Sequence, residues 1–266
     1  MRPDPDRPDS AREYARHRLP LRPILGAQAA GFVVAGLLLA LLEPGPLRQP
    51  LPLALVQGAV AATVARGQGA PRWWWAIHAA FVPLVVLASR LPLHPGWWLG
   101  AFVALLLVFW RTDRSRVPLY FSNAATADAL AQLLPQGACR IVDLGCGHGG
   151  LLFRIAAARP EARLVGVEHA PLPWLLARLR AVRHPNVTIR FGDLWQADLS
   201  RADVVYAFLS PAPMRRLWAK VVGEMPAQAL LVSNSFPVPD VAAWREIAVG
   251  DRRQTRLHCY RIPTVD

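Results

Sequence analysis

The chain has 266 residues and a formal net charge of +12, and hydrophobic types make up 53% of it against 18% charged types. This length accommodates one α/β domain plus a second unit. The charge does not indicate a nucleic-acid partner, because 13 of the 30 basic residues precede position 117 and no basic residues alternate with aromatic ones as a base-stacking surface requires.

The first part of the chain has the composition of membrane helices. Four stretches without Asp, Glu, Lys or Arg follow one another, at residues 23–42, 49–65, 73–89 and 91–110. The first is about as long as a helix that crosses a hydrocarbon core. It is too long for a cleaved secretory signal, and the stretches lack the polar faces of a soluble bundle. We therefore expect an all-α transmembrane region of about four helices over residues 23–110, with a re-entrant hairpin as an alternative for the short second stretch.

Arginine predicts the orientation of this region. Six arginines precede the first stretch, two lie between the second and third, three follow the fourth, and the other two loops hold one each. The positive-inside bias then places both chain ends in the cytoplasm. Because 29 of the 30 basic residues are Arg, we expect a high-GC bacterial source and a multi-pass protein of the bacterial inner (plasma) membrane, with residues 1–22 as a basic cytoplasmic segment.

From Val117 onward, short β patterns alternate with helical ones. Strands are predicted within 139–145, 162–168, 186–193, 202–209 and 229–236, and helices within 149–159, 171–183 and 213–225. This order favours a parallel sheet with right-handed crossovers and ligands at the carboxyl ends of its strands. Residues 244–262 predict two further strands joined by a Gly-Asp turn. The fold class is therefore α/β, a seven-stranded Rossmann-like sheet with a closing antiparallel hairpin.

The turn after the first strand carries a carboxylate among glycines. It reads "DLGCGHGG", with Asp143 two residues before Gly145. A dinucleotide site favours G-x-G-x-x-G and a pyrophosphate at the helix N-terminus, and a carboxylate here would repel that anion. The loop suits a cofactor with an ammonium group and a sulfonium, held where the backbone turns at Gly145 and Gly147.

Two further acids end the next two strands. Glu168 lies 25 positions after Asp143, where a carboxylate accepts both hydroxyls of a ribose. Asp193 ends the third strand, placed to accept an exocyclic amine, and Leu194 and Trp195 follow it to cover an adenine face. Three acids at consecutive strand ends indicate a nucleoside cofactor with a positive charge.

Across residues 117–262 the chain resembles the class I S-adenosylmethionine-dependent methyltransferases. The resemblance implies an enzyme that uses S-adenosyl-L-methionine and a methyltransferase domain over residues 123–266. The implied cofactor-binding residues are Asp143, Gly145, Cys146, Gly147, Glu168, Asp193, Leu194 and Trp195.

A narrower resemblance is to the membrane-anchored lysine methyltransferases that act on the adenine nucleotide translocase and on the ATP synthase c-subunit. It rests on "FGDLWQADL", "VVYAFLSPAPMRRLWAKVVGEM" and "LLVSNSFPVPD". The matching positions are Asp193, Leu194, Trp195, Phe208, Pro211, Met214, Lys220, Glu224, Phe236, Pro237 and Pro239.

The segment "VPLYFSNA" departs from this family's proline-rich aromatic motif. Val117, Pro118 and Tyr120 are present, but Ser122 and Asn123 stand where a second proline is expected. Four predicted spans also replace the family's usual single anchor. We interpret residues 111–122 as a linker and substrate-side motif. The resemblance implies a small integral membrane protein as the substrate, and the departures leave the acceptor open.

The chemistry of a lysine acceptor sets what the site must supply. Deprotonating an amine of pKa about 10.4 near pH 7.4 costs about 4 kcal/mol, and an apolar slot lowers this cost by disfavouring the ammonium form. Candidates for the slot are Tyr120, Phe121, Phe208 and the loop from Ser210 to Pro213. We predict Tyr120, Ser210 and Pro211 as the residues at the reacting centre, with Ser210 orienting the amine, and we identify no general base.

Other functions fit parts of the same pattern. A methyltransferase acting on a lipid, a quinone precursor or another small molecule at the membrane would share every cofactor residue. An aminopropyltransferase is expected to have a third glycine in the first loop and acidic residues after the fourth strand, where Leu209 and Ser210 stand. A non-enzymatic membrane scaffold would not need the three acids. Cys139, Cys146 and Cys259 form no C-x-x-C pair and the histidines lack ligand spacing, so we expect no metal and no disulfide.

Overall fold

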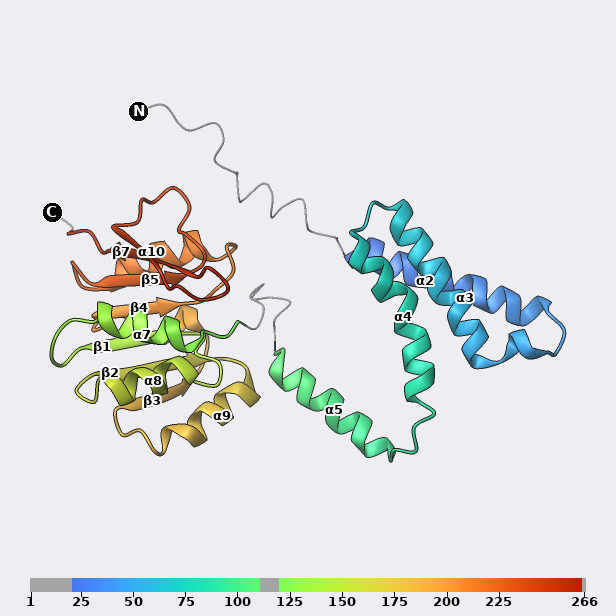
Figure 1. Ribbon diagram of the computed structural model, residues 1–266, viewed down its shortest axis with the longest axis horizontal. Helices are drawn as coiled ribbons and strands as arrows, with labels where there is room; N and C mark the ends of the chain where they lie inside the picture. The colour runs from blue at the N-terminus through green and yellow to red at the C-terminus, as the bar shows by residue number, and fades with distance from the viewer. Residues whose placement is uncertain (1–20, 111–119, 265–266) are drawn as a thin grey trace, which may run out of the picture. The chain divides into compact units, whose positions relative to one another are not determined.

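The computed structural model describes residues 21–110 and 120–264, except for the side chains of Leu21, Arg22 and Leu47. The chain divides into two compact units, Met1–Pro95 and Gly96–Asp266 (Figure 1).

The first unit is a set of packed helices: α2 (Leu21–Leu41), the 3-10 turn η1 (Pro46–Arg48), α3 (Pro50–Gly67) and α4 (Arg72–Ala88). Helices α3 and α4 approach closely at Gly58, where a Cβ would lie 2.3 Å from the Ala79 carbonyl oxygen. Polar side chains link all three long helices. Gln57 Nε2 donates to Gln28 Oε1 at 2.6 Å, and Gln28 Nε2 lies 2.8 Å from His78 Nδ1.

The expectation of four membrane spans is not supported. Within the described chain, only Pro23–Leu41, with 19 residues, is both long and apolar enough to cross a membrane. Helix α3 has 18 residues but falls short in hydropathy, and α4 has only 17. Helix α5 (Pro95–Val108) has 14 residues and no buried one, so its length is about 21 Å against a hydrocarbon core of about 30 Å.

The expected and observed numbers of spans differ because a run without charged residues does not always form a helix of the same length. The last run begins at Leu91, but α5 begins only at Pro95 and ends at Val108, because prolines at 92 and 95 restrict helix to the residues that follow them. The predicted multi-pass inner-membrane localisation is therefore not supported either.

The second unit contains the predicted seven-stranded sheet. Its strands are β1 (Arg140–Leu144), β2 (Arg163–Glu168), β3 (Val187–Phe191), β4 (Val204–Ala207), β5 (Leu230–Asn234), β6 (Arg245–Ala248) and β7 (Arg256–Arg261). Their order is β3-β2-β1-β4-β5-β7-β6. The first five are mutually parallel, and β7 pairs antiparallel with both β5 and β6. The predicted α/β sheet with its closing hairpin is thus confirmed.

Helices cover both faces of this sheet (Figure 1). One face carries α7 (Ala124–Leu133), α8 (Gly150–Ala158) and α9 (Pro171–Ala181), and the other carries α10 (Met214–Glu224). Successive strand residues point to opposite faces, so Ile141 packs in the core under α7 to α9 and Val142 in the core under α10. Helix α7 was not among the predicted elements.

Candidate active site

The glycine loop after β1 is held against the end of β2. The amides of Gly145 and Cys146 both donate to the Val167 carbonyl, at 2.8 and 3.1 Å. Gly145 has φ +87° and Gly147 has φ +56°, a region that side-chain-bearing residues rarely adopt. The two glycines therefore allow the sharp turn that the sequence predicts at this place.

Glu168, the last residue of β2, holds the glycine loop through hydrogen bonds that its carboxylate accepts. Its Oε2 accepts from the Gly147 amide at 2.8 Å, and its Oε1 accepts from the amides of His169 and Ala170 at 2.9 and 2.8 Å. The residue is only 6% exposed. Its oxygens keep further lone pairs to accept hydroxyl groups.

Asp143 lies one strand away in β1 and is 4% exposed. Burial, with the charge of Glu168 as a second cause, raises the pKa of Asp143 to about 8. The carboxyl group is therefore mostly protonated near neutral pH in the free protein. A cation bound beside it would favour the ionised form, so the position suits the ammonium group of a ligand.

Asp193 follows β3 and begins the short 3-10 helix η2 (Leu194–Gln196). Its Oδ1 accepts from the Trp195 amide at 3.1 Å. Trp195 is half-buried, and the Arg216 guanidinium lies 3.9 Å from the centre of its ring. The three acids thus lie near or just beyond the carboxyl ends of β1, β2 and β3, which are neighbours in the sheet.

Three aromatic rings from distant parts of the chain lie together. Tyr120 stacks on Phe208 with ring centres 4.8 Å apart and planes 15° apart. Phe236 lies 5.8 Å from Tyr120 and 6.4 Å from Phe208, measured between ring centres. We call Tyr120, Phe208 and Phe236 the aromatic cluster.

Ser210 lies two residues after Phe208, in the loop after β4. It is 1% exposed, and its Oγ has no hydrogen-bond partner within the described chain. A buried hydroxyl without a partner is uncommon, and an active site is one place where it occurs. Pro211 is half-buried, and its carbonyl accepts from the Met214 amide at the start of α10.

A small cavity joins the glycine loop to the aromatic residues. It has a volume of about 20 Å³, and its lining includes Tyr120, Phe121, Asp143, Gly145, Cys146 and Phe208. Ser210, Pro211, Glu168 and Asp193 do not line it. The structure therefore brings Tyr120 beside the predicted cofactor loop and leaves the two loop residues after β4 outside this cavity.

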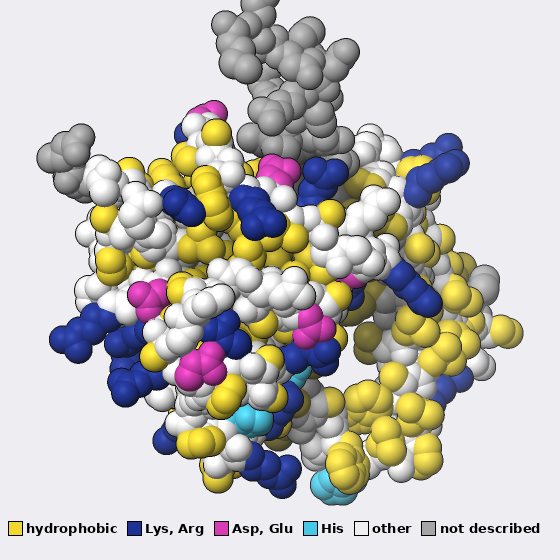
Figure 2. All heavy atoms as spheres, turned by 60° about the vertical axis from the view of Figure 1, so that its left-hand side comes forward, with side chains coloured by type: hydrophobic (Ala, Val, Ile, Leu, Met, Phe, Trp, Pro, Cys, Tyr) yellow, Lys and Arg dark blue, Asp and Glu magenta, His cyan; other side chains and the backbone are white. Residues whose placement is uncertain are grey.

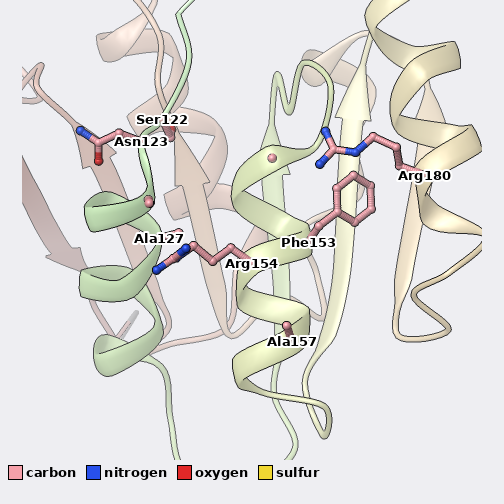
Figure 3. A pocket seen from close by; sticks show the side chains of 9 residues that line it. Ser122, Asn123, Ala127, Phe153, Arg154, Ala157 and Arg180 are labelled. Atoms are coloured by element: carbon pink, nitrogen blue, oxygen red, sulfur yellow. The ribbon is translucent and has the colours of Figure 1, made fainter.

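A larger groove of about 490 Å³ lies between α7 and α8 and is also lined by Ser122 and Asn123 (Figure 3). Arg154 of α8 points across it and forms a two-point ion pair with Asp128, at 2.6 and 2.8 Å. The groove shares Ser122 and Gly150 with the small cavity, but none of the three acids lines it.

A hydrogen-bond chain that the sequence did not predict anchors the segment before α7. Asn234 Nδ2 donates to the Tyr206 hydroxyl at 2.7 Å, and Tyr206 lies 2.6 Å from Ser122 Oγ. Because the Tyr206 oxygen already accepts from Asn234, its own proton is available for Ser122. Tyr206 is also the register partner of Asp143 across β1 and β4.

Asn123 makes a second connection. Its Oδ1 accepts from the Thr126 amide at 2.8 Å and caps α7, and its Nδ2 donates to Asp251 in the β6–β7 turn. Ser122 and Asn123, which depart from the family motif, thus fasten the segment to the sheet and the hairpin. Val117 and Pro118 of that motif lie outside the described residues.

The groups at this site fit S-adenosylmethionine. Within residues 21–110 and 120–264, no group of three His, Cys, Asp or Glu side chains is placed to hold a metal ion. Cys139, Cys146 and Cys259 are free thiols, each of them buried. A buried carboxyl of raised pKa, a carboxylate held by amides and a turn of glycines match a cationic amino acid joined to a nucleoside.

Comparison with known proteins agrees with this reading. Residues 143–245 match the family described as the ANTKMT methyltransferase domain. The chain is 31% identical to the adenine nucleotide translocase lysine N-methyltransferase of Mus musculus over 161 residues, which cover 57% of this chain and 68% of that protein. It is 32% identical to the Homo sapiens lysine N-methyltransferase of the ATP synthase c-subunit over 123 residues, 43% of this chain and about half (51%) of that protein.

A solved structure supports the fold and the cofactor. An RNA methyltransferase from Salinibacter ruber, in complex with S-adenosyl-L-homocysteine, superimposes with a TM-score of 0.51 at 26% sequence identity. The match covers 55% of this chain and 96% of that one. The chain therefore belongs to the ANTKMT methyltransferase domain family and is an S-adenosylmethionine-dependent methyltransferase.

Proposed function

We propose that this enzyme is attached to a membrane and N-methylates a lysine side chain of a membrane protein. The observation that carries the proposal is the aromatic cluster beside the cofactor loop, with the Tyr120 and Phe208 rings stacked 4.8 Å apart. A slot of this kind suits an amine that must lose a proton before it is methylated and that carries a positive charge afterwards.

The cofactor role is assigned residue by residue. When bound, S-adenosylmethionine supplies an electrophilic methyl group. In this proposal Asp143 holds its ammonium group and the backbone of Gly145, Cys146 and Gly147 surrounds its amino-acid part. Glu168 accepts the ribose hydroxyls. Asp193 accepts a hydrogen bond from the exocyclic amine of the adenine, and Leu194 and Trp195 cover the adenine ring.

The acceptor role falls to the aromatic cluster and the loop after β4. Removing the amine from water disfavours its ammonium form, so rings on several sides lower the cost of deprotonation. The ring faces then attract the cationic product. Ser210, whose hydroxyl is buried without a partner in the described chain, and Pro211 lie outside the small cavity and shape the loop that follows Phe208.

Membrane attachment is supported by two independent features. Pro23–Leu41 is long and apolar enough to cross a bilayer. The mouse relative is named for a lysine of the adenine nucleotide translocase and the human one for a lysine of the ATP synthase c-subunit. An enzyme and an acceptor in one membrane meet at a high effective concentration, which a soluble acceptor would not gain.

The test separates protein from lipid acceptors. Membranes from a strain lacking the gene are incubated with the purified full chain and cofactor labelled in its methyl group, then divided into solvent-extracted lipid and gel-resolved protein. The proposal expects label on a small integral membrane protein. Label confined to the lipid fraction would assign the enzyme to a lipid or quinone precursor instead, and a Glu168→Ala chain shows the background.

A further inference from the structure

Helix α9 buries its small side chains and exposes its large ones. Pro173, Ala177 and Ala181, spaced four residues apart, are buried against the sheet. The opposite side carries four large apolar side chains, Leu175 (44% exposed), Leu176 (47%), Leu179 (62%) and Val182 (82%). A surface helix of a soluble domain normally has the reverse arrangement, with its large apolar side chains facing the core. We call these four residues the α9 leucine face.

The charges around this face have one sign. Residues 169–192 contain no Asp or Glu but hold four arginines, Arg178, Arg180, Arg183 and Arg190. Arg180 is engaged within the domain, since it donates to the His148 carbonyl at 3.1 Å and lies over the Phe153 ring (Figure 3). Arg178 and Arg183 are exposed, and no ion pair is found for either in the described part of the chain.

The neighbouring strand extends the apolar area. Phe191, at the end of β3, is 56% exposed, and its ring lies edge-on to Trp174 of α9 at 5.3 Å between centres. On the face of the α/β unit in Figure 2, basic side chains are also more frequent than acidic ones. Exposed apolar side chains gathered in this way mark a surface that contacts a protein or a membrane.

The arginines decide between these two partners. A helix that lies in a membrane interface combines leucine and aromatic side chains with basic ones and few acids. Anionic lipid headgroups attract such arginines, by roughly a factor of five in affinity for each. A protein partner would need an acidic surface fitted to this helix alone, whereas an anionic bilayer offers both chemistries over any area.

We propose that the α9 leucine face, together with Arg178 and Arg183, docks on the surface of an anionic lipid bilayer. The proposal rests on the membrane attachment proposed above and adds a second contact to it. Helix α9 begins at Pro171, three residues after Glu168. Docking of α9 therefore holds the candidate active site within about one helix length of the headgroups, about 17 Å for its 11 residues.

The experiment places an environment-sensitive fluorophore on the full chain in vesicles. The three native cysteines are buried, so a Val182→Cys chain reacts with the label at position 182. A matched Arg201→Cys chain carries it at another exposed position, in the turn before β4. Each labelled chain is reconstituted in neutral phosphatidylcholine vesicles and in vesicles that also contain phosphatidylglycerol. Flotation confirms that the chain is in the vesicles, and some vesicles contain lipids with a quencher in the acyl chain.

We expect the label at 182 to shift to the blue and to be quenched by these lipids in anionic vesicles, and the label at 201 to do neither. The double change Arg178→Gln and Arg183→Gln should reduce the docked fraction in anionic vesicles several-fold, and salt at about 1 M should reduce it likewise. Two outcomes would overturn the proposal while leaving membrane attachment intact. In the first, the chains float but labels at 182 and 201 behave alike. In the second, the label at 182 shifts to the blue without quenching, which would indicate cover by protein. Failure to float would contradict membrane attachment itself.

Discussion

The amide of Gly147 donates to the Glu168 carboxylate at 2.8 Å. One carboxylate thus holds the glycine loop and stands where the ribose of the cofactor is expected. Loop shape and cofactor binding are therefore coupled through a single side chain, and a change at either residue should affect both.

We predict that Glu168→Ala and Gly147→Arg each abolish cofactor binding by the full chain. The first removes the acceptor for three amides. The second places a side chain at φ +56°, where a Cβ would already lie 3.6 Å from the Phe121 ring. Titration calorimetry with S-adenosylmethionine measures both. Glu224→Ala is the matched control and should bind normally, because within the described chain that carboxylate pairs with Lys220 of α10 and not with the glycine loop.

Asp143 predicts a pH dependence of stability in the cofactor-free enzyme. Its pKa is about 8 in the folded chain and about 3.9 in an unfolded one, so the folded state holds the extra proton between these values. The contribution of this carboxyl group to the free energy of unfolding should therefore be largest at or below about pH 4 and decrease as pH rises toward 8. Thermal unfolding from pH 5 to 8 measures this, and Asp143→Asn should flatten the slope. An equal slope in the two chains would rule out the assignment.

The raised pKa of Asp143 also predicts that a proton is released when S-adenosylmethionine binds. An ammonium ion beside Asp143 favours the ionised carboxylate, so cofactor binding near pH 7 should release close to one proton and strengthen as pH rises to about 8. Calorimetry in two buffers of different ionisation enthalpy measures the number of protons directly. Uptake of protons, or no exchange at all, would contradict the role given to this carboxyl group.

The link between Asn123 and Asp251 should position the acceptor side of the site. Asn123→Ala removes both the cap of α7, worth about 1 kcal/mol, and the contact with the β6–β7 turn. Asp251→Ala keeps the cap but removes the contact together with the two hydrogen bonds that Asp251 accepts from Thr255. Both should slow methylation of membranes several-fold, and the double variant should be no slower than the slower single variant. Asp240→Ala, which breaks an exposed ion pair with Arg215, is the control. Additive effects of the two changes would show that they act separately.

The aromatic cluster should affect the acceptor and not the cofactor. Phe236 does not line the cavity beside the glycine loop, so Phe236→Leu should leave cofactor affinity unchanged. It should lower the rate of membrane methylation roughly five- to thirty-fold, as expected for a cation–π contact of about 1–2 kcal/mol. Tyr120→Phe keeps the ring stacked on Phe208 and should retain more activity than Tyr120→Leu. Equal losses in both Tyr120 variants would assign the role to the hydroxyl.

Local patterns in the sequence were sufficient to predict the sheet and its acids. The strand period and the turn residues around Asp143, Glu168 and Asp193 are local, and parallel strands bring their carboxyl ends to one edge. The hydrogen bonds that hold Ser122 and Asn123, before α7, were not predictable in this way. Ser122 and Tyr206 are 84 residues apart, and Asn123 and Asp251 are 128 apart. No local sequence pattern indicates that these residues pair.

Helix lengths over residues 21–108 show a second limit. Charge-free runs predicted the positions of α2 to α5 but not their ends, which depend on prolines and on helix packing. The close approach of α3 and α4 at Gly58 and the Gln28–Gln57 contact required the three-dimensional arrangement. Only the first run, around Pro23–Leu41, kept both the length and the hydropathy of a span.

The central claim is that this methyltransferase modifies lysine on a membrane protein. The most direct measurement is acid hydrolysis of the protein band that the full chain labels in membranes lacking the gene, followed by separation of the labelled amino acids. The account predicts that the label is recovered as methyl-lysine and disappears with Glu168→Ala. Label recovered on any other amino acid, or protein without label beside labelled lipid, would contradict it.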